Sequence, residues 1–473
     1  MCIRDRLYST GGTKKYLEGL GLSVLAVEDQ TNYPEVFGGR VKTLHPAIFV
    51  GILYRRDNEL DSKELKEHQI PEIDLVVVDL YPFEETVASG ADHSSIIEKI
   101  DIGGISLIRA AAKNYKFISI ISTKKQYEGF TNHYLSTNGS PTIDYRKKLA
   151  AEGFGITLNY DKAISSYFQN KDKVILRYGE NPHQDAYFEG DLEGLFKKLN
   201  GKELSYNNLL DIDSAVSLIT DLSDNRLSTF AILKHNNACG CAKRETVYDA
   251  FKDALASDPV SAFGGILITD RQIDLETAEK IDKLFYEVCI ATSFTKEALE
   301  VLTKKSKRII LEWSMMEYKQ DLIRSCLNGE LVQQRDILNV DESKLTYPTI
   351  KKPNKQEVKD LLLADKIVKN TKSNAIILVK NGRLLSSGTG QTSRVDALKQ
   401  AIAKANAFNI DLKGSIMASD AFFPFPDCVE IAAEAGVEHV IQPGGSIKDS
   451  LSIEKANELG LSMVMTGIRH FKH

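Results

Sequence analysis

The sequence predicts an α/β protein of two domains, and three observations lead to this prediction. Short β-rich runs alternate with helical stretches along the chain, which is the order expected of layered α/β domains. The chain has 473 residues, 42% of them hydrophobic, which is enough for two or three hydrophobic cores. A helical pattern over residues 145–170 ends at the charged run Lys171-Asp172-Lys173. We therefore predict domains at 1–170 and 171–473.

In the first domain, an amphipathic helical segment at 94–114 is predicted between two β-rich runs. The predicted strands are 22–27, 73–80 and 117–123. Strands that alternate with helices in this way predict a parallel sheet.

In the second domain, Asn381-Gly382 between two β runs predicts a hairpin turn. The predicted strands are 230–233, 266–269, 375–379 and 437–442. Ser257-Asp258 and Ser419-Asp420 each follow a helix and each precede an Ala-Phe pair. This repetition predicts two similar halves, approximately 171–345 and 346–473.

Composition excludes several classes of protein. The net charge is -5, and no block of five consecutive basic residues occurs, so we expect no nucleic-acid partner. The apolar runs are far shorter than the roughly 20 residues that cross a bilayer, so we expect no membrane association. The six cysteines have no framework of regular spacings, which favours a reducing, cytoplasmic compartment. The opening residues 1–6 lack the features of a signal peptide.

Three segments of the first domain could bind an anion. Residues 9–13, STGGT, precede a helical run, and such a turn points N–H groups at a phosphate; a plain capped turn explains it equally well. Residues 38–46, GGRVKTLHP, combine two glycines with Arg40 and Lys42. Asp101 precedes a glycine pair, with cations at Arg109 and Lys113, although structural salt bridges would also account for these charges.

Together these segments resemble a known domain. STGGT, GGRVKTLHP, VVVDLYPF and IDIGGISLIRAAAKN, in this order within residues 7–170, are similar to the inosinate cyclohydrolase domain of a bifunctional purine-biosynthesis family. The resemblance implies a methylglyoxal-synthase-like fold. The catalytic residues that it implies are Lys42, Tyr81, Asp101 and Lys113. The residues that it places at the ribonucleotide are Ser9, Thr10, Gly11, Gly12, Thr13, Arg40 and Thr43.

The chain departs from this family at its beginning. Family members open with a β-strand and a phosphate-holding loop that contains Ser and Lys, and here residues 1–6 stand in their place. Absence of a first strand would expose an unpaired edge of a parallel sheet. We therefore expect reduced stability of the first domain.

The second domain has a candidate catalytic pair. Lys234 and His235 follow the apolar strand that ends at Leu233, and ligands of α/β proteins bind at the carboxyl ends of strands. Zinc binding by His235, Cys239 and Cys241 is a competing interpretation, but the spacing differs from the zinc-deaminase signature, so we expect no metal.

Other segments of this domain carry polar or aromatic groups suited to ligands. They are RYGENPHQ at 177–184, DPVSAFGG at 258–265, GTGQTSR at 388–394, SDAFFPFPD at 419–427 and the final TGIRHFKH. The Phe residues could hold a flat heteroaromatic ring or simply fill a core.

With LSYNNLLDIDSA and LKHNNACG, these segments resemble the folate-dependent transformylase domain of the same family, over residues 174–473. The resemblance implies tandem cytidine-deaminase-like halves without zinc, and a homodimer with the site at the interface. The residues that it implies as catalytic are Lys234, His235 and Asn374. Those at the ribonucleotide are Arg177, Tyr178 and Arg469. Those toward the folate are Phe263, Gly264, Arg394, Phe422 and Asp427.

The chain is thus predicted to transfer a formyl group from 10-formyltetrahydrofolate to aminoimidazole carboxamide ribonucleotide, and then to close the product to inosinate. Two alternatives remain open from the residues. One is a transformylase whose truncated first domain is inactive. The other is a nucleotide-binding regulatory module on a deaminase-like shell.

Overall fold

The computed structural model describes residues 6–34, 37, 40–168, 173–314 and 321–473. The chain divides into two compact units, Met1–Asp172 and Lys173–His473, and each is described here by itself. Within the described residues, no helix is both long and apolar enough to span a bilayer.

The described strands of the first unit form two separate parallel pairs. β1 (Leu7–Ser9) pairs with β2 (Val24–Ala26), and β3 (Leu75–Val77) pairs with β4 (Ser119–Ile121). Its helices are α1 (Gly11–Gly19), α2 (Val27–Thr31), α3 (Pro46–Leu53), α4 (Glu59–Glu67), α5 (Phe83–Ala88), α6 (His93–Ile97), α7 (Gly103–Lys113), α8 (Tyr127–Ser136) and α9 (Ile143–Phe168). The helix predicted at 94–114 is wrong as one element, because it is broken into α6 and α7 around Asp101.

Helix α7 is the centre of the first unit's core. Its Ile108 is fully buried and packs with Ile120 of β4 and Leu149 of α9. A side chain at Gly153 of α9 would bring a Cβ to 3.3 Å from Ile108, so the glycine permits α7 and α9 to pack closely. The apolar face of α7 therefore joins β4 to the longest helix of the unit.

Because its described strands form only separate pairs, we expect the first unit to be less stable than the second. A sheet of two strands is marginal by itself, and Leu25, Leu75 and Val77 on these strands are exposed. In calorimetry of the whole chain, we expect the first unit to melt at least about 5 °C below the second, because a deficit of 1 kcal/mol lowers the melting temperature by roughly 2–4 °C in a unit of this size. Hydrogen exchange of the backbone amides shows which unit unfolds in each melting transition. Amides in β3 and β4 that exchange as slowly as those in β8 would contradict this expectation.

The second unit is built on one sheet of eleven strands, in the order β21-β20-β19-β17-β18-β9-β8-β10-β12-β14-β7. These strands are β7 (Phe196–Asn200), β8 (Ser228–Lys234), β9 (Asn237–Arg244), β10 (Gly265–Thr269), β12 (Tyr286–Ala291), β14 (Ile309–Trp313), β17 (Ile376–Lys380), β18 (Arg383–Gly388), β19 (Ser415–Ser419), β20 (Val437–Gln442) and β21 (Ser462–Met465). The four strands predicted in this region correspond to β8, β10, β17 and β20.

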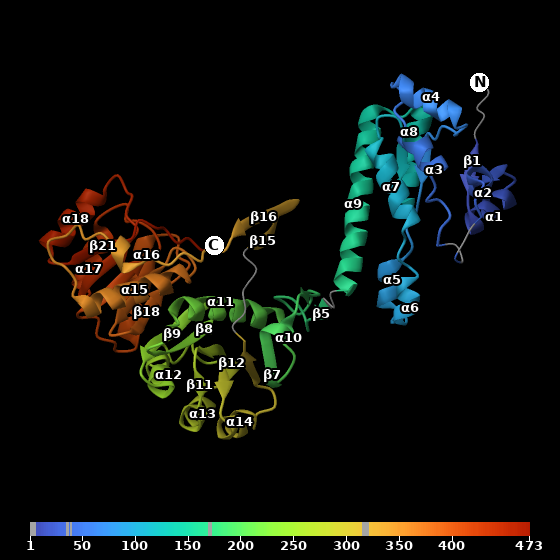
Figure 1. Cartoon of the computed structure of the whole chain (residues 1–473). Coiled ribbons are helices and arrows are strands. Elements are labelled where there is room, and N and C mark those ends of the chain that lie inside the picture. Colours follow the sequence, from blue (N-terminus) through green and yellow to red (C-terminus); the bar gives the residue numbers. More distant parts are fainter. Residues whose placement is uncertain (1–5, 35–36, 38–39, 169–172, 315–320) are drawn as a thin grey trace. The chain divides into compact units, whose positions relative to one another are not determined.

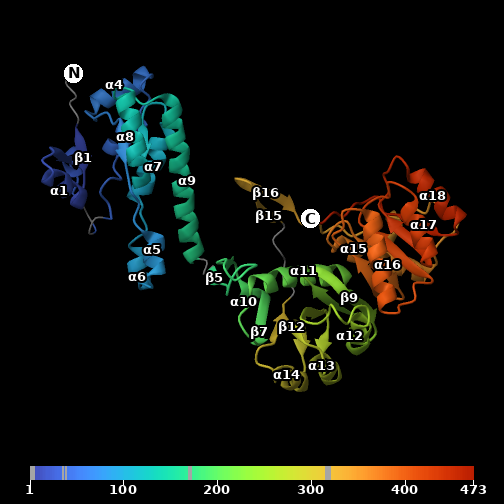
Figure 2. The same ribbon diagram turned by 180° about the vertical axis from the view of Figure 1, so that it is seen from behind.

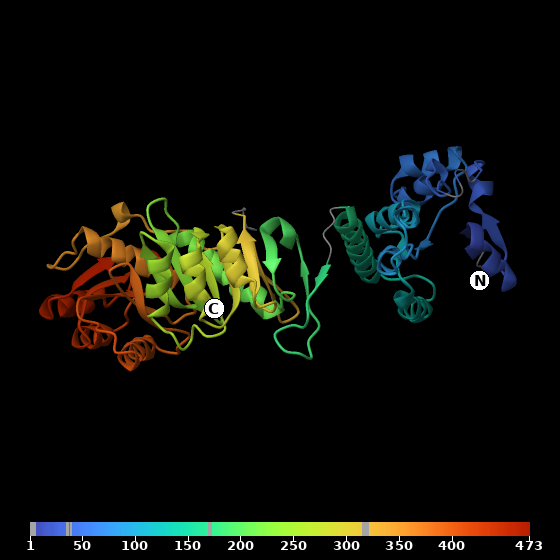
Figure 3. The ribbon, with the colours of Figure 1, turned by 90° about the horizontal axis from the view of Figure 1, so that it is seen from below.

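Helices cover both faces of this sheet. They are α10 (Leu192–Leu195), α11 (Tyr206–Leu222), α12 (Val247–Leu255), α13 (Leu275–Asp282), α14 (Lys296–Leu302), α15 (Lys355–Lys369), α16 (Arg394–Ala407), α17 (Asp427–Glu434) and α18 (Asp449–Glu458). α11 and α15 share one core with the strands, while α12–α14 and α16–α18 form two cores on the other face. Figures 1 and 2 show α12–α14 on the side of the sheet opposite α11, and these yellow-green helices face the viewer in Figure 3.

Short strand pairs lie outside this sheet. They are β5 (Lys173–Ile175) with β6 (Tyr187–Glu189), β11 (Gln272–Ile273) with β13 (Ser293–Phe294), and β15 (Asp321–Cys326) with β16 (Gly329–Gln334).

The second unit is an internal repeat. α11, the hairpin β8–β9 and then α12-β10-α13-β12-α14-β14 correspond in order to α15, the hairpin β17–β18 and then α16-β19-α17-β20-α18-β21. The hairpins meet at the middle of the sheet, where β18 pairs antiparallel to β9. The predicted hairpin turn is confirmed, because Asn381 and Gly382 join β17 to β18 with φ of 52° and 69°.

The predicted correspondence of Asp258 with Asp420 is wrong in register. Asp420 follows the strand β19 and accepts the N–H of Ala375 at 3.2 Å. Asp270 follows the equivalent strand β10 and accepts the N–H of Thr229 at 2.8 Å. The two Ser-Asp pairs therefore do not occupy equivalent positions in the two halves. Residues of the repeat correspond by their place relative to the strands of the sheet, and not by their distance from a preceding helix.

Candidate active sites

The turn after β8 carries the predicted catalytic pair. Lys234 pairs with Asn237, so His235 and Asn236 are the two central residues of the hairpin turn, with φ of 50° and 66°. Residues with a Cβ seldom adopt this left-handed region, and such strain is concentrated at functional sites. The equivalent turn of the second half has the sequence Asn-Gly, which suits this conformation better.

Lys234 reaches the segment after α12. Its Nζ donates to the carbonyl oxygens of Gly264 at 2.9 Å and of Phe263 at 3.3 Å. The Phe263 ring is 63% exposed and lies with its centroid 4.9 Å from that of Phe285. The structure thus brings one catalytic candidate together with two of the residues predicted to face the folate.

Asn237 connects this turn to the second half. Its Nδ2 donates to the carbonyl of His235 at 2.8 Å, and its Oδ1 accepts the N–H of Lys372 at 2.9 Å. Two residues further along, Asn374 donates to the carbonyl of Gln391 at 2.9 Å. Because β18 runs antiparallel to β9 and to β17, the starts of β9 and β17 lie at the same end of the sheet, which places Asn374 and His235 at that end.

Arg394 is held tightly in this cluster. Its guanidinium forms an ion pair with the fully buried Asp420 and donates to Asn374 Oδ1 at 3.1 Å. It also donates to the carbonyl of Phe422 at 3.2 Å. Asn374, Arg394 and Phe422 are thereby brought together. Asp427 begins α17, where its carboxylate accepts the N–H of Cys428.

The C-terminal tail completes this part of the unit. His470 donates its N–H to the carbonyl of Asp420 at 3.0 Å, and Ser373 donates to the carbonyl of Lys472 at 2.9 Å. The predicted Arg469 directly precedes the anchored His470, and its guanidinium lies 4.5 Å from the ring centroid of Phe471. Burial lowers the pKa of Lys472.

Arg177 and Tyr178 form a local pair, with the guanidinium 4.9 Å from the ring centroid. Their loop is tied to the start of α11, because Asn207 Nδ2 donates to the carbonyl of Glu180 at 3.1 Å.

Two cysteines follow the turn in the sequence. Cys239 and Cys241 are buried in β9, and burial raises the pKa of each thiol to about 12. Among the described residues, no group of three or more His, Cys, Asp or Glu side chains is placed to hold a metal ion.

The first unit gathers part of its predicted site around the first turn of α1. Thr10 is the N-cap of this helix, and a Cβ built on Gly11 would lie 3.8 Å from Lys42 Nζ. A Cβ built on Gly103, the first residue of α7, would lie 3.0 Å from Thr43 Oγ1. Ser9, Gly12 and Thr13 belong to the same turn, whereas Gly38 and Gly39 lie outside the described residues.

Asp101 lies at the N-terminal end of α7. Its carboxylate accepts the N–H of Gly104 at 2.6 Å, and burial raises the pKa of this carboxyl against the opposing backbone N–H groups of Gly104 and Tyr81. A Cβ on Gly104 would lie 2.6 Å from the carboxylate, so only glycine fits there. Asp101 and Tyr81 are therefore neighbours, as the predicted site requires.

Two predicted residues of the first unit lie elsewhere. Lys113 ends α7, roughly 15 Å along the helix from its first residue, and lines a groove with Phe49 and Phe154. Arg40 forms an ion pair with Glu98, which holds the pKa of that carboxyl below its usual value. Lys113 therefore lies at the opposite end of α7 from Asp101.

Comparison with known proteins gives the family. Residues 5–106 match the family described as MGS-like domain, and residues 111–404, more than half of the chain, match the AICARFT/IMPCHase bienzyme. A relative from Bacteroides thetaiotaomicron, "Bifunctional purine biosynthesis protein PurH", is 56% identical, with 98% of this chain and 93% of the relative covered. The chain belongs to the AICARFT/IMPCHase bienzyme family.

Two further bienzymes with the same description are more distant. That of Persephonella marina is 43% identical, over 99% of this chain and 95% of its own length. That of Bacillus cereus strain AH187 is 44% identical, over 98% of this chain and 94% of its own. The predicted α/β class with an MGS-like first domain is confirmed, and so is the prediction of a bifunctional formyltransferase and cyclohydrolase of purine biosynthesis. The bienzyme family uses a folate-derived formyl donor. The regulatory-module alternative is not supported.

Some residues at the candidate site of the bienzyme's second unit were not predicted from the sequence. Asp211, Asn237 and Asp420 all contact predicted site residues or the turn that bears them. Asp211 and Asn237 occur in the quoted segments LSYNNLLDIDSA and LKHNNACG, and Asp420 begins the aromatic segment. Their contacts join segments that are distant in the sequence, and the bond from Asn237 to Lys372 also depends on the pairing of β9 with β18.

Proposed function

We propose that the second unit transfers a formyl group from 10-formyltetrahydrofolate to the amine of aminoimidazole carboxamide ribonucleotide at Lys234, His235 and Asn374. The observation that carries this proposal is the connection through Asn237, which joins the His235 turn to the loop of Asn374. This connection brings candidate groups from both halves to one place, which supports a site for two substrates.

The substrate's aromatic amine is a weak nucleophile, because its lone pair is delocalised into the imidazole and the carboxamide. His235 takes the proton from this amine as it attacks, since imidazole is the side chain best suited to proton transfer near neutral pH. Lys234 has three N–H donors, and the carbonyls of Phe263 and Gly264 accept two of them. The third donates to the oxyanion of the tetrahedral intermediate, and Lys234 then protonates the departing folate nitrogen.

The remaining predicted residues divide between the two substrates. Arg177, Tyr178 and Arg469 hold the ribonucleotide. Phe263, whose ring is largely exposed, offers a face for the pterin, and Gly264 follows it directly in the chain. Phe422 and Asp427, from the second half, are assigned to the same substrate. Arg394 is already engaged by Asp420 and Asn374, which favours a role in holding Asn374 over contact with the folate. Neither proposed step requires a metal.

We propose that the first unit closes the formylated product to inosinate with loss of water. Orientation dominates such an intramolecular reaction. Lys42 stabilises negative charge on oxygen, Tyr81 donates a hydrogen bond, and Asp101 assists proton transfer at the amide nitrogen. Lys113 has no part in this step, because it lies at the opposite end of α7 from Asp101. Ser9–Thr13, Arg40 and Thr43 hold the phosphate end of the ribonucleotide.

Separate assays test the two activities. Tetrahydrofolate release reports formyl transfer, and inosinate formation from purified formylated intermediate reports closure. Both signals support the bifunctional enzyme. Formyl transfer without closure would instead support the alternative of a transformylase with an inactive first domain.

We further propose a homodimer, working in a reducing cytoplasm, in which the hairpin β15–β16 docks on a second copy. This hairpin projects from the second unit (Figures 1 and 2), and Ile323 and Val332 lie opposite each other on it, 64% and 59% exposed. Isolated two-stranded hairpins are marginal in water, so apolar side chains here need a cover. The residue after β16, Arg335, pairs with Asp213 of α11, close along the chain to Asp211.

Charged substitutions in the hairpin test this assembly. We expect Ile323→Asp with Val332→Asp to convert a dimer to a monomer in analytical ultracentrifugation and to reduce formyl transfer, while closure continues. Ile447→Asp, at a fully exposed residue outside the hairpin, is the matched control and should remain dimeric. A double variant that stays dimeric, or a monomeric parent enzyme, would remove the hairpin as the interface.

A further inference from the structure

The Asp211 side chain contacts the turn that carries Lys234 and His235. Asp211 lies on α11, and its Oδ1 accepts the N–H of Asn236 at 2.6 Å. Burial raises the pKa of this carboxyl, while the backbone N–H of Asn236 and the nearby His235 and Lys234 side chains oppose the shift. A single carboxylate therefore binds the middle of the turn and lies close to both members of the proposed catalytic pair.

This turn needs external support. His235 and Asn236 both have positive φ, a region that residues with a Cβ seldom adopt, although Asn and His do so more often than most. Hairpin turns of this kind normally contain Asn-Gly or Asp-Gly. A contact from outside the hairpin can hold the unfavourable conformation, and the bond from Asn236 to Asp211 is such a contact.

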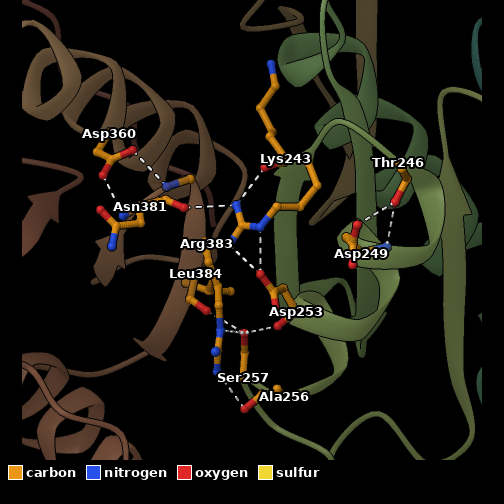
Figure 4. Close-up of polar contacts among 12 residues, drawn as sticks. Lys243, Thr246, Asp249, Asp253, Ala256, Ser257, Asp360, Asn381, Arg383 and Leu384 are labelled. Atoms are coloured by element: carbon orange, nitrogen blue, oxygen red, sulfur yellow. Dashed lines mark hydrogen bonds and ion pairs between the residues drawn. The ribbon is translucent and has the colours of Figure 1, made fainter.

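The second half contains the same device without the catalytic pair. Asp360 of α15 accepts the N–H groups of Asn381 at 2.6 Å and Gly382 at 2.8 Å (Figure 4). α11 and α15 both begin with a capping box, at Ser205 and Asn354, and each carboxylate belongs to the sixth residue of its helix. The carboxylate-to-turn bond is thus a property of the repeat, and its chemical use differs between the halves.

The surroundings of the second turn explain that difference. Arg244 donates to the carbonyl of Asn381 and pairs with Asp253, and Arg383 donates to the carbonyl of Ala256 (Figure 4). These cations are occupied by protein groups in packing the two halves together. At the first turn, in contrast, Lys234 donates to the carbonyl of Phe263, and the side chain of Phe263 is exposed.

We propose that Asp211 is a positioning residue of the transformylase, which uses the turn-holding bond of the repeat to fix His235 and Lys234 in their reactive geometry. This inference rests on the proposed roles of those two residues. Asp211 does not contact substrate in this proposal. It acts by holding the backbone of His235 at positive φ, a conformation that the turn would not otherwise keep.

Two variants at Asp211 and one control test the inference in the full-length enzyme. We expect Asp211→Ala to lower kcat of formyl transfer by about 10–10²-fold with little change in KM for the ribonucleotide, because small displacements of reacting groups have effects of this size. Asp211→Asn should remain within about threefold of the parent kcat, since its amide oxygen can accept the same N–H. Asp360→Ala, which removes the equivalent bond at the other turn, should remain within about twofold.

Measurement of His235→Ala in parallel separates the possible failures. Normal kcat in Asp211→Ala beside an impaired His235→Ala overturns the positioning role alone. Normal kcat in both overturns the proposed catalytic pair as well. Equal losses in folded Asp211→Ala and Asp360→Ala overturn the inference, because they indicate a general loss of stability. A folded Asp211→Asn enzyme as impaired as Asp211→Ala also overturns it, because the bond to Asn236 would then not be the cause.

Discussion

His235→Ala should lower the turnover number of formyl transfer by about 10²–10⁴-fold, the range associated with loss of a general acid–base. The reason is that the aromatic amine must lose a proton as it attacks, and alanine cannot accept one. The measurement is steady-state release of tetrahydrofolate at saturating ribonucleotide. The position is a hairpin turn, so the substitution removes no buried packing.

The control for His235→Ala is His68→Ala, at an exposed histidine after α4 in the first unit. It should leave formyl transfer unchanged. His235→Ala should in turn leave closure of purified formylated intermediate unchanged, since closure is assigned to the other unit. A turnover number near that of the parent would remove His235 from the proposed mechanism.

Lys42→Ala should lower ring closure by at least about 10²-fold, because removal of one donor to a developing oxyanion typically has an effect of 10²–10³. Lys42 reaches the turn at Gly11, where the phosphate end of the substrate is proposed to bind, so ribonucleotide affinity should also fall. Inosinate formation from purified formylated intermediate measures the effect. Formyl transfer should stay within about twofold of the parent.

The control for this variant is Lys63→Ala, at an exposed lysine of α4. It removes the same charge from the same unit and should leave closure unchanged. Closure that survives Lys42→Ala would show that the assignment of Lys42 is wrong. Both variants are compared with the parent enzyme. A parent enzyme that itself shows no closure would support the alternative of a transformylase with an inactive first domain.

Local chemistry explains what could be predicted. Strands such as β8, β17 and β20 are runs of buried apolar residues, and the turn at Asn381-Gly382 needs the positive φ that these residues tolerate. The position of Lys234 and His235 at the end of β8 was predicted from the apolar run that precedes them. The helix at 94–114 failed because periodicity does not register the break around Asp101, where burial and the contacts of Tyr160 and Gly104 decide the backbone.

By itself the sequence determined the α/β class, the family, the strand-end position of Lys234 and His235, and the existence of a repeat. Only the tertiary structure decided how these parts meet. Asp211 reaches Asn236 across 25 positions, and Asn237 reaches Lys372 across 135. The physical reason is range: turn preferences and apolar periodicity act over a few residues. The order of eleven strands, which brings β9 to β18, is set by packing across the whole unit.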